Sequence, residues 1–358
     1  MFDDVTAAAD ESAEFSQDAT AGPTVNALQV HQVLELKTAS PLIACRFDPL
    51  GRYVFAAGED CTICRWSVEG GEPVVLAGHE SWTRGLAFSP DGAWLYSGGY
   101  EGRLIAWPTA ADAPQPAWSI EAHDGWLRGV ATSYDGQLVA TCGNDHLVKL
   151  WNAVDGSPVA VLRGHEHHVY SVDFHPDGAS LVSGDLKGVL RHWDLATHSQ
   201  PRQFDAGKLW KYDEGFRADI GGTRSMAFSP DGRLLAVSGI TNVSNAFAGV
   251  GNPLVVLLDW ESGEPIQALA SKEGIQGVLW GVVVHADGFV VGASGGQGGG
   301  NLFFWWPDSP DEFHKLKLPH TARDLALHPD GLTLAAAHYD RHLRLYRMTA
   351  PAEVADQA

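Results

Sequence analysis

Arginine and aromatic side chains recur at fixed places ahead of a repeated turn in this chain of 358 residues. The sequence Trp-x-Arg-Gly occurs twice, at residues 82–85 and 126–129. Arginine forms bidentate, charge-assisted hydrogen bonds with carboxylate or phosphate groups and stacks on aromatic rings. Tryptophan and arginine are also the residue types that dominate binding hot spots. The pattern therefore predicts a site for an anionic group or an acidic peptide.

Three other motifs could do chemistry, and each has a structural explanation. Ser294 stands in a G-x-S-x-G sequence, but no helical pattern follows it, as a nucleophile elbow requires. Cys61 and Cys64 form a C-x-x-C pair, but an odd spacing on a strand points the two sulfurs to opposite faces. The histidines at 165, 167 and 168 suggest no metal geometry. We therefore expect no catalytic residue, no metal and no cofactor.

The repeated turn shows which elements must position the arginines. Proline presets φ, aspartate bonds back to the backbone and glycine accepts a positive φ, which is the chemistry of a turn between two strands. The glycines are separated by 41, 44, 42, 54, 56 and 43 residues, and short apolar strands flank each turn. The seven copies are Asp48-Pro-Leu-Gly51, Ser89-Pro-Asp-Gly92, Ser133-Tyr-Asp-Gly136, His175-Pro-Asp-Gly178, Ser229-Pro-Asp-Gly232, His285-Ala-Asp-Gly288 and His328-Pro-Asp-Gly331.

Alignment on these turns gives two series of candidate binding residues. Seven residues before each turn, the chain has Trp82 and Trp126 in the second and third repeats. Arginine occupies four of the seven positions that lie five residues before a turn. Those seven positions hold Ile43, Arg84, Arg128, Tyr170, Arg224, Trp280 and Arg323.

Composition limits the partners of this chain. The formal charge is −20, and an acidic protein is repelled by phosphate backbones, which argues against nucleic acid as the main partner. No apolar run approaches the roughly 20 residues of a membrane helix. Residues 1–18 lack the features of a secretory signal, so we expect a cytoplasmic protein with no membrane partner. Four cysteines are too few and too irregularly placed for a disulfide framework.

The repeat resembles that of the WD-repeat family, which has a Gly-His near the start and a Trp-Asp near the end of each unit. This chain has Gly78-His79, Gly164-His165 and Trp193-Asp194, and an aromatic residue ends a strand after every turn. The resemblance covers about residues 29–349. It implies an all-β fold, a seven-bladed β-propeller with four-stranded antiparallel blades around a central channel.

The resemblance also implies that His, Ser or Thr, Asp and Trp brace each blade. Blade 3 has the full set as His123, Thr141, Asp145 and Trp151. Blade 2 has Glu101 in place of the aspartate, and Lys187 stands at that position in blade 4. A buried polar network stabilises only when every member has a partner. We therefore expect blade 3 to be the best braced.

The chain ends suggest how the ring closes. The last blade has only three strands of its own, and a spare strand at residues 30–36 precedes the first blade. We expect that N-terminal strand to complete the last blade and remove an exposed edge. Residues 1–26 hold six acids and no Lys or Arg. Residues 1–28 are expected to form a disordered acidic arm, and residues 350–358 a disordered tail.

The resemblance implies that both series of residues line the rim of the channel mouth. The hypothesis is a non-enzymatic protein-interaction scaffold, a monomeric subunit of an assembly, that binds an acidic or phosphorylated partner segment there. The insertions at residues 205–222 and 240–253 are expected on the same face. Charge reversal at Arg84 and Arg128 should abolish partner capture without lowering stability.

Two alternatives stay open. One is a small-ligand-binding or hydrolytic propeller that uses the same mouth. The other is that the rim arginines pair only with local acids such as Asp324, Glu80 or Glu101 and bind no ligand.

Overall fold

The computed structural model describes residues 24–245 and 250–351. Most of the expected acidic arm (1–28) and of the expected tail (350–358) lies outside the described residues. Residues 24–28 do contact the last blade, because the Asn26 N–H donates to Met348 O at 2.7 Å. A short 3₁₀ helix, η1 (Ala27–Gln29), then leads into the first strand.

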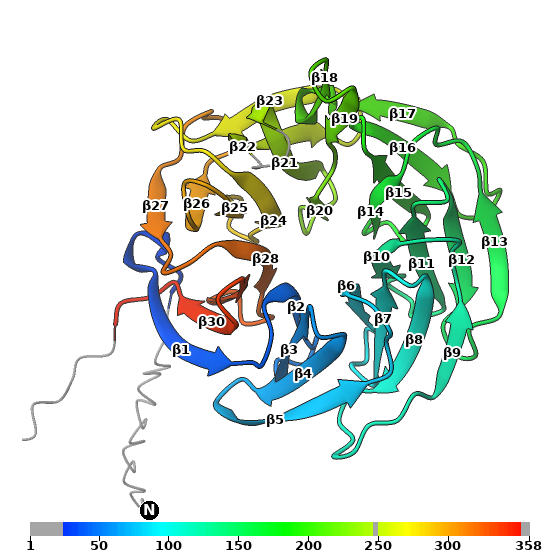
Figure 1. Cartoon of the computed structure of the whole chain (residues 1–358). Coiled ribbons are helices and arrows are strands. Elements are labelled where there is room, and N and C mark those ends of the chain that lie inside the picture. Colours follow the sequence, from blue (N-terminus) through cyan, green and yellow to red (C-terminus); the bar gives the residue numbers. More distant parts are fainter. Residues whose placement is uncertain (1–23, 246–249, 352–358) are drawn as a thin grey trace, which may run out of the picture.

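Seven four-stranded antiparallel sheets surround a central channel, which confirms the predicted propeller (Figure 1). Blade 1 contains β2 (Leu42–Phe47), β3 (Tyr53–Gly58), β4 (Thr62–Ser67) and β5 (Gly70–Ala77). Blade 2 contains β6 (Thr83–Phe88), β7 (Trp94–Gly99), β8 (Arg103–Pro108) and β9 (Trp118–Glu121). Blade 3 contains β10 (Leu127–Thr132), β11 (Leu138–Gly143), β12 (Val148–Asn152) and β13 (Pro158–Leu162). Blade 4 contains β14 (Val169–Phe174), β15 (Ser180–Asp185), β16 (Val189–Asp194) and β17 (Arg202–Asp205).

The later blades carry the two insertions. Between blades 4 and 5, the 3₁₀ helix η2 (Gly207–Leu209) precedes a hairpin of β18 (Trp210–Asp213) and β19 (Ala218–Gly221). Blade 5 contains β20 (Ser225–Phe228), β21 (Leu234–Asn245), β22 (Val250–Asp259) and β23 (Pro265–Ala270). Blade 6 contains β24 (Val278–Val284), β25 (Val290–Gly295), β26 (Asn301–Trp305) and β27 (His314–Lys317). Blade 7 contains β28 (Ala322–Leu327), β29 (Thr333–His338), β30 (His342–Arg347) and, from the other end of the chain, β1 (His31–Lys37).

Apolar side chains fill the gap between every pair of neighbouring blades. Each gap has its own buried cluster, so the hydrophobic core forms a ring that is continuous around the channel. Trp66, Trp107, Trp193 and Trp305, which end the third strands as the sequence predicts, are among the largest fully buried side chains. Burial of such side chains is the main stabilising contribution to the ring.

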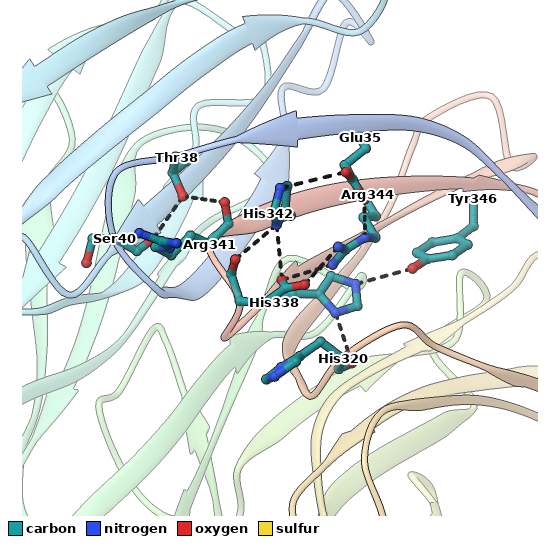
Figure 2. Close-up of polar contacts among 10 residues, drawn as sticks. Glu35, Thr38, Ser40, His320, His338, Arg341, His342, Arg344 and Tyr346 are labelled. Carbon is teal, nitrogen blue, oxygen red and sulfur yellow. Dashed lines mark hydrogen bonds and ion pairs between the residues drawn. The ribbon is translucent and has the colours of Figure 1, made fainter.

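Strand β1 closes the ring, as predicted, by pairing with β30. Charged side chains strengthen this seam (Figure 2). Arg344 donates to Glu35 of β1 at 2.7 Å and makes a two-pronged contact with Asp340 at 2.8 and 2.9 Å. Beneath them, His338 lies 3.0 Å from His320 O and 3.3 Å from the Tyr346 hydroxyl. Burial, with a smaller contribution from Arg344, lowers the pKa of His338 to about 4.

Three blades contain a complete side-chain brace. In blade 3, His123 lies 2.8 Å from Asp145 and 2.7 Å from Thr141, whose hydroxyl also accepts from Trp151 at 2.8 Å. Burial lowers the pKa of His123, which keeps the ring neutral. Its Nδ1–H then donates to the carboxylate, and its Nε2 accepts from the hydroxyl. Every member of the network therefore has a partner.

The expectation that blade 3 is the best braced is wrong because of blade 4. In blade 2, Glu101 fills the acid position and contacts His79, while Ser97 lies 2.7 Å from His79 and 2.8 Å from Trp107. In blade 4, the acid is Asp185 at the end of β15, 2.9 Å from His165, and not the residue at position 187. The strand end brings this carboxylate within reach two residues earlier. Blade 3 is therefore not better braced than blade 4, whereas in blade 2 the buried Oε2 of Glu101 has no hydrogen-bond partner among the described residues.

Candidate functional site

Local irregularities in the first strands place the predicted rim residues. In six blades, the pairing of the first and second strands shifts at the residue five positions before the turn. The residues skipped by the pairing are Ile43, Arg84, Arg128, Tyr170, Trp280 and Arg323. In blade 5, Arg224 lies just before β20, and its backbone N–H donates to Ser238 O. Because a bulge redirects a side chain away from the regular strand alternation, these residues face the mouth of the channel.

The glycine after the bulge has a packing role. A Cβ atom at Gly85 would lie 2.5 Å from the Val130 side chain, and one at Gly281 would lie 2.5 Å from Leu325 N. The first strands approach one another closely around the channel, so a side chain does not fit at this position. In the Trp-x-Arg-Gly sequence, the arginine thus faces the mouth, and the glycine after it fits where neighbouring first strands leave no room for a side chain.

Aromatic rings and guanidinium groups alternate around the mouth. The Arg128 Cζ atom lies 4.0 Å from the centre of the Tyr170 ring, and Arg224 lies 4.9 Å from that same ring. Trp280 is then shared by Arg224 at 5.2 Å and Arg323 at 5.1 Å. Cation–π contacts contribute about 0.5–2 kcal/mol each. They hold the arginines in place without neutralising their charge.

The alternative in which local acids neutralise the rim arginines is wrong for the acids it names. Asp324 pairs with Arg46 at 2.7 Å. Glu80 lies 3.7 Å from Arg103, and Glu101 belongs to the blade 2 brace. Within residues 24–245 and 250–351, no ion pair joins an acid to Arg84, Arg128, Arg224 or Arg323. The four rim arginines therefore stand at the mouth without a direct ion-pair partner among the described residues.

The four arginines differ in the hydrogen bonds they form. Arg84 donates to the carbonyl oxygens of Ile43 and Arg323, the latter at 2.9 Å, and so ties blade 2 to blades 1 and 7. Arg128 donates to Asn144 at 2.5 Å. Charge reversal at Arg84 would place a carboxylate beside carbonyl oxygens. We therefore expect the reversal at Arg84 to lower stability, in contrast to the prediction from the sequence.

Arg224 and Arg323 are the arginines most available to a ligand. The side chain of neither forms a hydrogen bond with a described residue, and the buried Nε of Arg224 has no partner there. Burial lowers the pKa of Arg224, and repulsion by Arg128 and Arg84 lowers it further. Burial and Arg84 lower the pKa of Arg323 in the same way. A negative group in the mouth would relieve both the missing hydrogen bonds and the repulsion.

The hollow between these side chains is small. A cavity of about 60 Å³ is lined by Arg84, Arg128, Tyr170 and Arg224, with Arg46 and Asp324 deeper in the channel. A buried water needs about 10–15 Å³ of such volume, so the cavity holds a few waters or a small charged head group. It does not admit a folded segment, which would have to lie across the mouth.

An exposed aromatic row adjoins the mouth on blades 2 and 3. Trp82 and Trp126 are 39% and 45% exposed. Tyr100 lies between them, stacked on Trp126 at 4.4 Å and 6.3 Å from Trp82. The row meets the arginines at Arg128, whose Cζ lies 4.9 Å from the Trp126 ring. The structure thus brings all eight predicted rim residues to one end of the channel.

The sequence-based search missed two aromatic residues of this surface. Tyr100 lies 5.9 Å from Arg128, and Tyr339 lies 5.5 Å from Arg323. Both follow the second strand of their blades directly. Alignment on the end of the second strand, in addition to the turn before it, would have revealed them.

The two insertions pack beside the mouth. Ile240 and Val243 of the lengthened β21 form an apolar cluster with Val278, and Ile220 of the hairpin and Trp280 pack against it. Lys211 of the hairpin donates to Val243 O at 2.8 Å, which fastens the two insertions together. The insertions therefore lie on the same face as Trp280, as the sequence predicted.

The remaining motifs provide no catalytic arrangement that we can describe. The Ser294 hydroxyl is buried without a hydrogen-bond partner among the described residues. Burial raises the pKa of both Cys61 and Cys64. In the part of the chain that the structure describes, no three His, Cys, Asp or Glu side chains group closely enough to hold a metal. None of the described helices is long and apolar enough to cross a membrane.

Comparisons with known proteins agree with this architecture. A sequence model of the WD domain, G-beta repeat, matches residues 28–67, 71–107, 114–152, 156–194 and 314–347. The chain is 29% identical over 165 residues to the nuclear distribution protein nudF of Emericella nidulans, covering 40% of this chain and 37% of nudF. It is 26% identical over 170 residues to the human angio-associated migratory cell protein, covering 43% and 39% of the two chains. The matches thus span about two fifths of the length of these relatives.

Proposed function

Because the chain belongs to the WD-repeat family, whose propellers typically mediate protein–protein interactions, we propose that it is a non-enzymatic scaffold that binds an acidic or phosphorylated segment of a partner at the arginine-rich mouth. One observation carries this proposal: Arg84, Arg128 and Arg224 line a small cavity, Arg323 shares the Trp280 ring with Arg224, and none of the four forms an ion pair with a described acid. Charge-assisted hydrogen bonds from guanidinium groups to carboxylate or phosphate are strong and directional.

The proposed binding mode follows from the shape of the mouth. The anionic group of the partner enters the cavity and accepts hydrogen bonds from Arg224 and Arg128. The flanking residues of the partner lie over the exposed row of Trp82, Tyr100 and Trp126. A central polar anchor surrounded by aromatic contact area is a common arrangement in protein interfaces. Assembly membership, a monomeric state and a cytoplasmic location stay predictions.

A peptide-binding assay tests the proposal. The probes are fluorescein-labelled hexaglutamate, hexaglutamine and a hexaglutamate with one phosphoserine, measured by fluorescence anisotropy. We expect the two acidic peptides to bind and the glutamine peptide to remain free. Binding of a charged group to arginine weakens with added salt. Equal affinity for the glutamine and glutamate peptides would contradict the proposal.

Variants assign the binding to the mouth. The Arg224→Gln/Arg323→Gln double variant should weaken binding of the acidic peptides by at least about tenfold, since hydrogen bonds to charged groups contribute about 1.5–3 kcal/mol each. Arg233→Gln is the matched control, because Arg233 is exposed in a turn at the opposite end of the first strands. Affinity unchanged by the double variant would exclude the mouth. Competition by inorganic phosphate as strong as by the phosphopeptide would instead favour the small-ligand alternative.

A further inference from the structure

The channel opens at its other end into a second hollow, which we call the lower basin. The first strand of each blade runs from the arginine mouth to the repeated turn, so the turns surround the opposite opening. The basin has a volume of about 540 Å³, far larger than the cavity at the mouth. Its wall is mostly apolar and includes Phe47, Phe88, Val130, Leu327 and the turn prolines Pro49 and Pro90.

One carboxyl group without an ion-pair partner among the described residues faces this apolar wall. Arg46 and Asp173 are the charged side chains that line the basin. Arg46 is neutralised by Asp324 at 2.7 Å, whereas Asp173 forms no ion pair with any described residue. Its Oδ1 accepts from the Phe174 N–H at 3.0 Å. Enclosure by the channel wall raises the pKa of Asp173 to about 7, although Arg46 acts in the opposite direction.

The propeller architecture does not require a carboxylate at this position. Arg46 and Asp173 stand two residues before the turns of blades 1 and 4. At this position the other five blades have a small or branched apolar residue. Those residues are Ala87, Ala131, Ala227, Val283 and Ala326. A desolvated carboxylate in place of such a side chain disfavours the folded state. Groups of this kind, located in a hollow, are candidates for function.

We propose that the lower basin is a second binding site, separate from the mouth, which receives a lysine or arginine side chain of a partner protein. The cation pairs with Asp173, and the alkyl stem packs along the apolar wall. Long basic side chains combine these two properties. Tyr134, 57% exposed beside the basin, offers the cation an aromatic face as well. The ionised forms of Arg46, Asp173 and Asp324 together carry a net negative charge, which selects a basic ligand over an acidic one.

The methionines provide a direct probe of this site. The chain has three, of which Met226 lines the basin and Met348 is buried at the ring closure. In protein labelled with ¹³C at the methionine methyl groups, n-pentylammonium stands for the basic side chain and 1-pentanol for its neutral counterpart. We expect n-pentylammonium to shift the Met226 signal with saturation and to leave the Met348 signal unchanged.

Two variants determine whether Asp173 is responsible. Asp173→Asn should weaken n-pentylammonium binding by about tenfold, to the level of 1-pentanol, since it removes a charged partner. Its melting temperature should equal or exceed that of the wild type at pH 8, which shows that the variant folds. Because Met226 also borders the mouth cavity, Arg224→Gln is the control for binding there, and it should leave the n-pentylammonium affinity of the basin unchanged. Equal affinities for ammonium and alcohol, unchanged affinity in Asp173→Asn, or an unresponsive Met226 signal would each overturn the proposal.

Discussion

Blades 4 and 6 have the same four-stranded plan but hold their strands together in different ways. In blade 4, the Ser183 hydroxyl joins His165 at 2.7 Å to Trp193 at 2.8 Å. In blade 6, Gly292 occupies the place equivalent to Ser183, and the hydroxyl of Ser294, two residues further along the strand, has no hydrogen-bond partner among the described residues. The tryptophan of blade 6, Trp305, donates to Ala270 O at 2.9 Å instead.

Aromatic packing replaces the polar network in blade 6. Phe303 stacks on Trp305 at 5.2 Å, and Phe313 stacks on Trp306 at 5.1 Å. The family model matches the first three strands of blade 4 but none of residues 195–313, which include blade 5 and the first three strands of blade 6. The comparison teaches that a four-stranded blade forms without the His–Ser–Trp network when buried aromatic surface takes its place. A polar network is lost when one member is lost, but apolar packing tolerates individual changes better.

Blade 7 is held together in a third way, because β1 from the other end of the chain completes its sheet. Removal of β1 should have the largest effect on stability. A chain lacking residues 1–37 loses β1, the burial of Leu36 and the Glu35 contact with Arg344. Loss of the strand's hydrogen bonds and apolar burial should cost about 5 kcal/mol or more, which is the whole stability of many domains. Urea denaturation followed by circular dichroism measures the loss.

Removal of residues 1–23 alone is the control for that truncation. This deletion leaves η1 and β1 in place, so we expect the urea midpoint to stay at the wild-type value. Equal midpoints for the two truncations would show that β1 does not close the ring.

The Ser183→Ala substitution tests the brace of blade 4. It leaves the Trp193 N–H without an acceptor and His165 without its hydroxyl donor, both buried. An unsatisfied buried polar group costs about 1–3 kcal/mol, so we expect a loss of about 3 kcal/mol in the free energy of unfolding. Urea denaturation at pH 7.5 measures it. A loss below 1 kcal/mol would mean that the network contributes little to this blade.

The pH dependence of stability tests the contribution of the buried His338 to blade 7. Burial holds the pKa of His338 at about 4, below the ordinary value of 6.5. The unfolded chain binds a proton there first, so His338 favours folding above pH 6.5 and this contribution is lost as the pH falls toward 4. Between pH 7.5 and 5 the loss is about 2 kcal/mol.

The His338→Gln variant isolates this contribution. It should be less stable than the wild type at pH 7.5, yet the difference should shrink by about 2 kcal/mol at pH 5. Chemical denaturation at both pH values gives the comparison. A difference that does not change with pH would show that another group is responsible for the acid sensitivity.

Tandem periodicity made the architecture predictable, because seven copies of one turn at near-constant spacing indicate seven equivalent units. The alignment on that turn also predicted that Arg84, Arg128, Arg224 and Arg323 lie at one end of the channel, where their guanidinium groups contact the rings of Tyr170 and Trp280. Interactions that depend on atomic reach were not predictable. Asp185 replaces the residue at position 187 because a strand end brings it close enough, and no spacing rule contains that information. The charge of the mouth likewise depended on which partner each acid selects.

The smallest expected effect completes the comparison of blades 4 and 6. Ser294→Ala removes a buried hydroxyl that has no hydrogen-bond partner among the described residues, so nothing favourable is lost and its desolvation cost disappears. The free energy of unfolding should change by less than about 0.5 kcal/mol, or increase slightly. Measured beside Ser183→Ala, it is the same chemical change in the second strand of another blade, two residues beyond the position equivalent to Ser183. Equal losses of unfolding free energy in the two variants would show that the effect of the hydroxyl does not depend on the His–Trp network. The distinction between a polar and an aromatic brace would then fail.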